Sequence, residues 1–345
     1  IRMDPFTQGL LGAAFSQSFA SKKKIPLACL SGTLGGLAPD LDILIVSATD
    51  PLLGIEFHRH FTHSIWFIPI GGFLVAVALW FIINKLLKIN EWKFKTLYIF
   101  TTLGYATHAI LDACTSYGTR LFWPFSNTRV AWDTIAVIDP IPTLALFIFV
   151  VLSYRLLSVK MARLGIVFMI GYLLLGFIQN QRVALAIKEI SSLRGHEIES
   201  LKLNPTLGNL IVWRAIYRHN GRYFVDGVIA QPFIKPKIIS GTSVATIDPE
   251  KIYPQLDKYS TQREDIRRFN YFAQGYLFEY QGTISDLRYG TEPHKVQPIW
   301  GIKIKPKTPD AHAEYLGFSR PNGRAFGVLW SMLNGSYVTN QEDLK

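Results

Sequence analysis

The chain has 345 residues, 49% of them hydrophobic, and a formal net charge of +11. Long apolar stretches are concentrated in residues 1–180, whereas 181–345 has the mixed composition of a soluble domain, so a uniformly soluble protein is excluded. Basic loops that set membrane topology explain the positive charge better than nucleic-acid binding, which we do not expect, and the two cysteines, Cys29 and Cys114, form no disulfide framework.

Apolar runs long enough to cross a bilayer dominate the first half of the chain. The segment 5–20 is shorter and more polar, and it could span the membrane, lie buried in a bundle or lie on the surface; its small residues favour a span. No cleavable signal peptide is apparent. We therefore predict an α-helical membrane bundle of five to six transmembrane helices in residues 1–180, with clear spans near 25–46, 65–84, 96–114, 141–158 and 164–180.

Basic clusters predict the orientation of this bundle. Lysines 22–24, the lysines of 85–95 and the basic residues of 155–163 fall on alternate connections, so one orientation places all of them in the cytoplasm. The connections 47–64 and 115–140 and the C-terminal half then face outward. Polar groups far apart in the sequence are thereby brought to one membrane depth.

The first of these groups is Asp40 and Asp42, which follow Pro39 in an apolar segment. Proline opens a helix, and carboxylates in apolar surroundings need a compensating charge. Two carboxylates two residues apart cannot share one face of a regular helix. In a broken helix both could bind a metal, or one could bind and the other orient a histidine; the alternative is a helix end with solvated aspartates.

The second group is the histidine cluster His58, His60 and His63, with Arg59 between the first two. Imidazole is a common zinc ligand, and a guanidinium suits a phosphate or carboxylate. An interfacial basic loop is the alternative, but it leaves His63 at the start of a span unexplained. His63 is therefore the best candidate ligand and His60 the weakest.

The third group is His108 and Asp112, four residues apart and so on one face of a predicted helix. They could grip one ion, or form a hydrogen bond that stabilises the bundle, or act as ligand and orienter. In the loop that follows, hydroxyls and Arg120 could contact an anion, and Asp139-Pro140 is typical of a helix start.

The C-terminal half, 181–345, predicts a small mixed, mainly β domain. A helix is expected over 181–194, and strands are expected over 209–217, 222–230, 275–282 and 298–305. The tripeptide His219-Asn220-Gly221 predicts a hairpin turn. No ligand cluster is visible in this half, where the histidines at 196, 219, 294 and 312 look like isolated surface residues.

These motifs together resemble the YdjM-like family of LexA-binding, bacterial inner-membrane, metal-dependent hydrolases. The resemblance is carried by Met3 to Gly9, Pro39 to Asp42, His58-Arg59 with Thr62-His63-Ser64, His108 to Asp112, and Thr115 to Thr119 with Trp123-Pro124. Many relatives have histidine at the position of Gln8, so a first-helix ligand stays open here. The family implies a multi-pass inner-membrane protein with a metal-activated water.

We therefore hypothesise an inner-membrane metallohydrolase whose site lies at the periplasmic face. Its metal ligands would be Asp40, Asp42, His63, His108 and Asp112, with Asp40, His58 and Arg59 in the reaction. Zinc is favoured, with manganese or magnesium as alternatives, and two metals are conceivable. The expected partners are membrane lipids and a lipid or phosphoester substrate. The alternatives are a non-enzymatic membrane protein with a structural metal and a partner-binding outer domain, and a transporter, which lacks a visible internal repeat.

Overall fold

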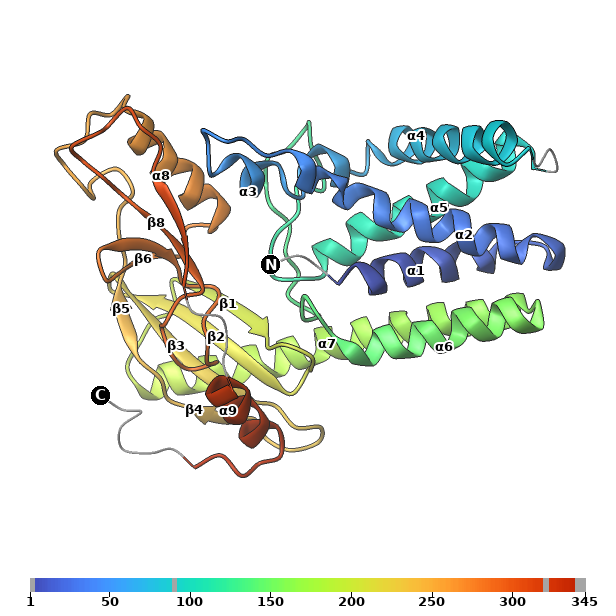
Figure 1. The fold of residues 1–345 in the computed structure, drawn as a ribbon. Helices are drawn as coiled ribbons and strands as arrows, with labels where there is room; N and C mark the ends of the chain where they lie inside the picture. Colours follow the sequence, from blue (N-terminus) through green and yellow to red (C-terminus); the bar gives the residue numbers. More distant parts are fainter. Residues whose placement is uncertain (1–3, 89–91, 319–322, 339–345) are drawn as a thin grey trace. The chain divides into compact units, whose positions relative to one another are not determined.

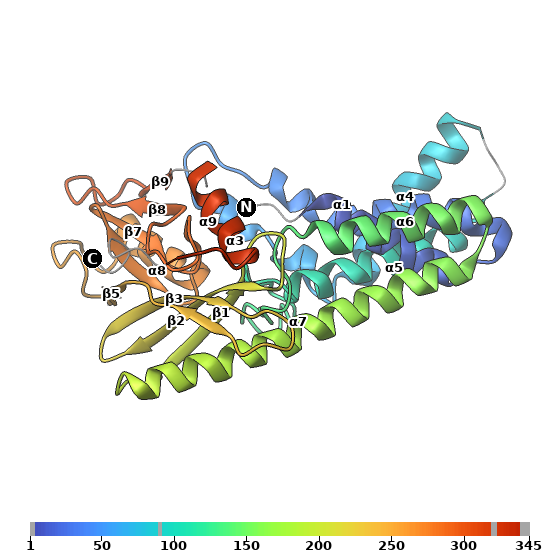
Figure 2. The ribbon, with the colours of Figure 1, turned by 90° about the horizontal axis from the view of Figure 1, so that it is seen from below.

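The structure is a computed structural model that describes residues 4–88, 92–318 and 323–338, so Met3 lies outside the described residues. The chain divides into two compact units. The first, the helical unit, comprises Ile1–Leu44, Phe57–Phe177 and Leu207–Asn209, and the second, the mixed unit, comprises Ile45–Glu56, Ile178–Thr206 and Leu210–Lys345. Figures 1 and 2 show the helices of the first unit side by side and the strands of the second.

The helical unit follows the predicted order of segments. Its elements are α1 (Pro5–Ser18), η1 (Lys22–Lys24), α2 (Ile25–Leu37), η2 (Ala38–Leu44), η3 (Phe61–His63), α4 (Ile68–Phe81), the π-helical η4 (Ile82–Leu86), α5 (Phe94–Ala113), α6 (Pro140–Leu156) and the first part of α7 (Val159–Leu193). A short helix, α3 (Leu53–Phe57), precedes η3. Helix α1 packs against α2, α5 and α6, and α5 also packs against α2 and α4.

Helix starts follow local rules. Asp4 caps α1 by accepting a hydrogen bond from the Phe6 amide, and Pro5 occupies the first turn. Asp139 caps α6 in the same way through the Ile141 amide, with Pro140 next, which confirms the predicted helix start. Both caps place an acceptor at donors that would otherwise have no partner.

Glycines bring α1, α2 and α5 into backbone contact. A Cβ atom on Gly12 would lie 2.4 Å from the carbonyl oxygen of Gly32, and one on Gly104 would lie 2.2 Å from the same oxygen. Side chains at these positions would force the helices apart. This close approach sets α2 beside α5, so that the residues that follow α2 lie near the C-terminal part of α5.

Among the described residues, three helices are long and apolar enough to cross a membrane: Lys22–Leu44, Ile68–Leu86 and Val159–Leu193. Pro140–Leu156 is a shorter apolar helix. Exposed side chains of α4, α6 and α7 are largely apolar, as lipid contact requires: Phe73, Leu74, Phe81, Leu144, Phe147, Leu174 and Phe177. The number of five to six spans stays a prediction.

The mixed unit contains two antiparallel sheets. The first is β1 (Ser200–Pro205), β2 (Val212–His219), β3 (Arg222–Ile229) and β4 (Lys237–Ile239) in that order, with β5 (Ser243–Ala245) also on β3. The second is β6 (Leu277–Tyr280), β7 (Thr283–Asp286), β8 (Trp300–Lys303) and β9 (Glu314–Gly317). This unit also contains α8 (Thr261–Phe272), α9 (Gly323–Leu333), most of α3 and the final part of α7.

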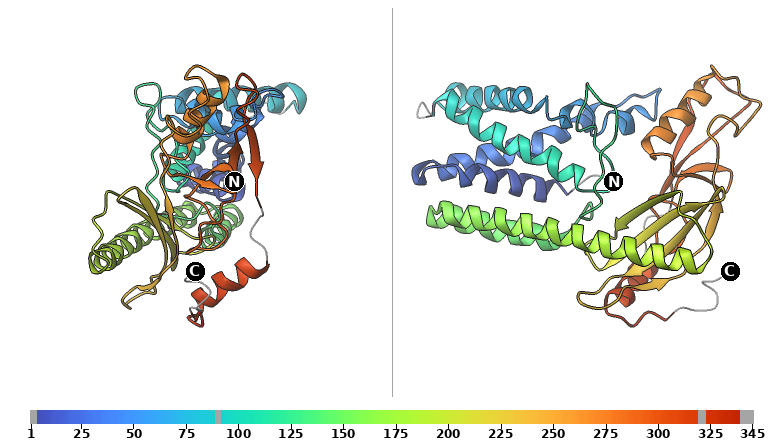
Figure 3. Two further views of the ribbon diagram at one scale, coloured as in Figure 1. Left: turned by 90° about the vertical axis from the view of Figure 1, so that its left-hand side faces the viewer. Right: turned by 180° about the vertical axis from the view of Figure 1, so that it is seen from behind.

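The final part of α7 covers one face of the first sheet (Figure 3). Val183 and Ile187 of α7 are fully buried against Trp213 and Tyr217 of β2. Asn220 and Gly221 both have positive φ, at 46° and 69°, in the β2–β3 connection, which confirms the predicted hairpin.

Two sequence-based boundaries were wrong. The predicted span 164–180 and helix 181–194 form one continuous helix, α7, because three of the four polar residues at their junction, 179–182, are good helix formers and neither proline nor glycine lies among the four. The strand predicted over 275–282 ends at Tyr280, and β7 begins at Thr283, because Gln281 and Gly282 adopt positive φ in a turn.

Candidate metal centre

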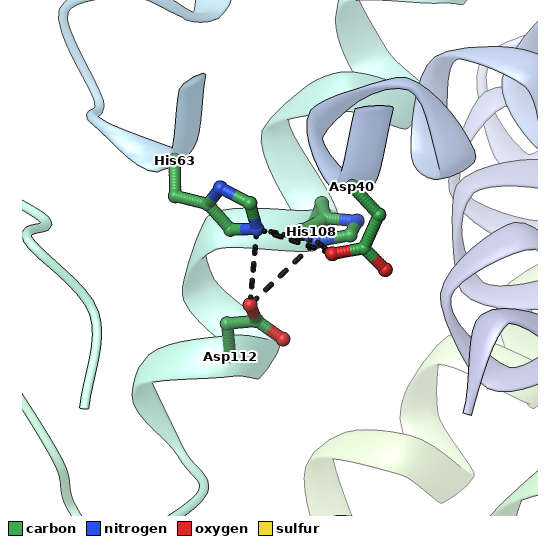
Figure 4. Close-up of side chains that lie close together, drawn as sticks. All are labelled: Asp40, His63, His108 and Asp112. Atoms are coloured by element: carbon green, nitrogen blue, oxygen red, sulfur yellow. Dashed lines mark hydrogen bonds and ion pairs between the residues drawn. The ribbon is translucent and has the colours of Figure 1, made fainter. Parts of the chain in front are cut away.

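Four predicted site residues converge in the helical unit. Asp40 comes from η2, His63 from η3, and His108 and Asp112 from one face of α5. Each offers one ligand atom, and these four atoms lie within 4.8 Å of one another. Figure 4 shows the four side chains pointing toward one another. We call this set the four-ligand cluster.

The distances within the four-ligand cluster fit a single ion. His63 Nε2 lies 3.4 Å from Asp40 Oδ1, 3.2 Å from Asp112 Oδ2 and 3.0 Å from His108 Nε2. His108 Nε2 lies 3.4 Å from Asp40 Oδ1 and 3.6 Å from Asp112 Oδ2. A tetrahedral ion with bonds of about 2.0–2.2 Å holds its ligand atoms about 3.3–3.6 Å apart. Three of the five distances lie in this range and the other two are 0.1–0.3 Å shorter, so the cluster is slightly tighter than a tetrahedral zinc shell.

The contacts of the two Nδ1 atoms determine whether the Nε2 atoms of His63 and His108 can bind a metal ion. His108 Nδ1 lies 2.6 Å from the carbonyl oxygen of Gly36, which can only accept a hydrogen bond. His63 Nδ1 lies 2.9 Å from Thr62 Oγ1 and 3.3 Å from Asp42 Oδ2, and Thr62 Oγ1 itself donates to Asp42. We therefore assign the proton of each neutral ring to Nδ1, which leaves both Nε2 lone pairs for a metal ion.

Burial makes this arrangement costly without a cation. His63, His108 and Asp112 are fully buried, and the Asp40 side chain is 18% exposed. Two lone pairs and two carboxylate oxygens facing one another in a buried site repel unless a positive charge lies between them. The residues present thus fit a divalent metal ion, with Asp40 at the most exposed corner.

Asp42 lies beside the four-ligand cluster and contacts Nδ1 of His63, a member of the cluster, and Nδ1 of the neighbouring His58. Its Oδ2 accepts from the Arg59 amide at 2.8 Å and lies close to His63 Nδ1, and its Oδ1 is 2.9 Å from His58 Nδ1. This is the orienting arrangement that the sequence left open. Asp40, Asp42 and His58 also form a second group with ligand atoms close together, so a second ion is compatible with the set.

His58 and Arg59 have buried atoms that point to a ligand. His58 is 7% exposed, and with Nδ1 fixed by Asp42 its Nε2 has no hydrogen-bond partner among the described residues. Arg59 is fully buried and pairs with Asp112 through Nε at 2.9 Å. His58 Nε2 is therefore placed to accept a proton.

His60 does not join either group. It is buried between Phe57 and Trp123, with ring centroids 5.2 Å and 5.4 Å away. Burial, with Arg120 and Arg129 nearby, lowers the pKa of His60 to about 4, so the ring is neutral at physiological pH. This agrees with its rank as the weakest candidate ligand.

Sequence reasoning did not assign the roles that Gln8, Thr115 and Arg129 have in the structure. Gln8 of α1 donates from Nε2 to Asp112 Oδ1 at 2.8 Å, so the first helix contacts the cluster through an amide that orients a carboxylate. Thr115 accepts from Arg59 Nη1 at 2.8 Å, and Arg129 donates to the carbonyl of Gly118 at 2.9 Å. The signal for Gln8 was its polarity in an apolar segment; nothing in the sequence singled out Arg129.

The mixed unit holds a separate group, Asp50, Asp265 and His312, and this corrects the expectation of isolated histidines. His312 Nδ1 lies 3.0 Å from Asp265 Oδ2, and His294 is fully buried. Arg268 of α8 already fills this group, because it pairs with Asp50 and Glu56 at 2.8 Å and with Asp265 at 3.0 Å. The sequence did not reveal this group because the partners of His312 lie far from it along the chain.

We expect Arg268→Ala to destabilise the mixed unit by about 1–3 kcal/mol, because it removes the shared donor of three carboxylates, one of them buried. The neighbouring Arg267 is half-exposed and pairs with the exposed Glu250 and Glu264, so Arg267→Ala should destabilise the unit far less than Arg268→Ala does. Urea unfolding of the full chain in detergent measures both. Equal effects of the two substitutions would contradict this account.

These features define a class of protein: a membrane protein with a buried cluster of histidines and aspartates that can hold a divalent ion. Residues 3–183 match the family described as YdjM inner membrane protein, just over half of the chain, and the chain belongs to this family, which confirms the resemblance seen in the sequence. Comparisons with curated proteins and with solved structures found no match.

Proposed function

We propose that the protein is a multi-pass inner-membrane metal-dependent hydrolase that acts on a phosphoester or lipid-linked substrate at the periplasmic membrane face. Residues 1–180 would form the membrane domain of five to six spans, and 181–345 would form a periplasmic domain. The observation that carries the proposal is the four-ligand cluster with His58 beside it: a metal-sized set of donors next to a buried, oriented imidazole with an unpartnered Nε2.

Each residue has a role that follows from its contacts. Asp40, His63, His108 and Asp112 would hold the ion, and Asp42 would fix the rings of His58 and His63. A divalent ion there would lower the pKa of a bound water and polarise the scissile bond. His58 would take the proton at Nε2 and return it to the leaving group.

The geometry also favours a second candidate, a membrane protein whose metal is structural. Four protein ligands around one ion are typical of structural zinc, whereas catalytic zinc keeps one position open. Against this, the Asp40 corner is partly exposed, and Asp40 could yield its position to water or bind manganese or magnesium in a larger shell. His58 has no role in a purely structural site.

Metal removal and a substrate screen distinguish the two candidates. The purified chain in detergent should contain about one zinc, manganese or magnesium ion and should release phosphate from a panel of phospholipids and lipid-linked phosphoesters. A chelator should abolish this activity, and the native metal should restore it. Bound metal whose removal unfolds the protein, with no turnover on any substrate of the panel, would favour the structural site instead.

A further inference from the structure

A buried guanidinium lies beside the four-ligand cluster with one nitrogen unused. Arg59 Nη1 donates to Thr115 Oγ1 at 2.8 Å and to the Asp112 carbonyl at 3.3 Å, and Nε pairs with Asp112. Nη2 has no hydrogen-bond partner among the residues that the structure describes. A fully buried cationic N–H group without an acceptor is costly, so an acceptor is missing from this position.

The backbone of Arg59 is held in a conformation that few arginines adopt. Its φ is 61°, in the left-handed region. The Arg59 amide donates to Asp42 Oδ2, and its carbonyl accepts from the Arg120 amide at 3.0 Å. Strained residues of this kind persist where surrounding contacts fix them, and they cluster at ligand sites. The strain here directs the guanidinium inward.

A second guanidinium, that of Arg129, contacts the same Tyr117 ring as the Arg59 guanidinium. The guanidinium carbons of Arg59 and Arg129 lie 4.7 Å and 5.5 Å from the centroid of the Tyr117 ring. The His58 ring centroid is 5.4 Å from the same ring. Arg129 is 6% exposed, and its Nη2 donates to the carbonyls of Gly118 and His58. Two guanidinium groups and the His58 imidazole therefore lie around one aromatic ring.

This environment fits a phosphate group. Guanidinium groups bind phosphate oxygens through several N–H donors, and a tetrahedral phosphate has enough oxygens to reach a metal ion and a guanidinium at once. The Arg59–Asp112 ion pair, at 2.9 Å, connects such an anion directly to the four-ligand cluster. His58 Nε2 would lie beside the same group.

We propose that Arg59 and Arg129, arranged around Tyr117, form the subsite for the phosphate group of a phosphoester. This inference rests on the proposed hydrolase function and specifies its substrate class. The phosphate can come from a lipid headgroup or from a soluble ester. Trp66 and Phe125 are 55% and 78% exposed, and their rings contact edge-to-face with centroids 5.3 Å apart. They are the interfacial kind of aromatic pair that accompanies a lipid headgroup.

The test is binding of inorganic phosphate to the full chain in detergent, measured by calorimetry with and without metal. Arg59→Lys keeps the charge but loses the fork, and Arg129→Gln loses the second cation; each should weaken phosphate binding about tenfold or more while bound metal stays unchanged. Arg155→Gln, at an exposed position of α6, is the matched control and should have no effect. Both variants keep a positive charge at position 59, so the buried Asp112 carboxylate is not left without a cationic partner.

Two results would overturn the subsite: no phosphate binding by the parent in either state, or binding that neither variant weakens. If the parent protein contains no metal, the proposed hydrolase function is wrong. If this metal-free protein still binds phosphate, and the binding depends on Arg59 and Arg129, the subsite is supported all the same. The same titration in phosphatidylcholine nanodiscs identifies the source. If the subsite binds lipid headgroups, added phosphatidic acid should compete with phosphate more strongly than added phosphatidylglycerol does. If the subsite binds only soluble esters, the two lipids should not differ in their effect on phosphate binding.

Discussion

Replacing His63 or His108 by alanine is expected to empty the metal centre. Each Nε2 lies within 3.6 Å of both cluster carboxylates, so each substitution removes a donor from the middle of the ligand set. Metal affinity should fall by more than the ten- to hundredfold typical of residues that only orient ligands. Elemental analysis of the purified proteins, with competition titration against a chelator, measures the loss.

The matched control is His219→Ala, because His219 lies in the mixed unit outside the metal-sized groups found among the described residues. It should leave metal content unchanged. Size-exclusion profiles and helical content separate lost binding from lost folding. Full metal content in both His63→Ala and His108→Ala would show that the four-ligand cluster is a hydrogen-bonded network and would contradict the proposed centre.

The second large effect is expected for Asp42→Asn. The carboxylate holds the Nδ1 atoms of His58 and His63, at 2.9 Å and 3.3 Å, and it accepts from the Arg59 amide. Asparagine has one oxygen and one NH2 group, and the Arg59 amide requires the oxygen. The NH2 group therefore faces His58 Nδ1 and places the proton of that ring on Nε2, while His63 Nδ1 loses its contact with a carboxylate. Metal affinity should then fall about 10–100-fold, because the orienting partner of a ligand is lost.

Turnover of Asp42→Asn should fall further, by about 10²–10⁴-fold at saturating metal, because His58 loses its function as a base. His58→Gln should reproduce the loss of turnover and keep the metal, which separates the two roles of Asp42. Asp248→Asn, at an exposed position, is the control. Equal turnover of Asp42→Asn and the parent at saturating metal would remove His58 and Asp42 from the reaction.

The local features of the fold were readable from the sequence. Hydropathy located segments that are helical in the structure, from α1 to α7, because apolar runs of that length and capping pairs such as Asp139-Pro140 act locally. The turn at Asn220-Gly221 was equally local. The interruption at Gln281-Gly282 and the continuity of α7 were missed, because neither breaks the local pattern of apolar residues.

The sequence by itself showed three polar groups, Asp40-Asp42, His58-His63 and His108-Asp112, within or next to apolar segments, and its basic clusters predicted that they share one membrane depth. Only the tertiary structure separated Asp42 from the four-ligand cluster and brought Gln8 and Arg129 beside it. The physical reason is that a residue is a metal ligand only if its side chain is oriented with one particular atom toward the ion. That direction depends on contacts such as Gly36 to His108, which join residues 72 positions apart.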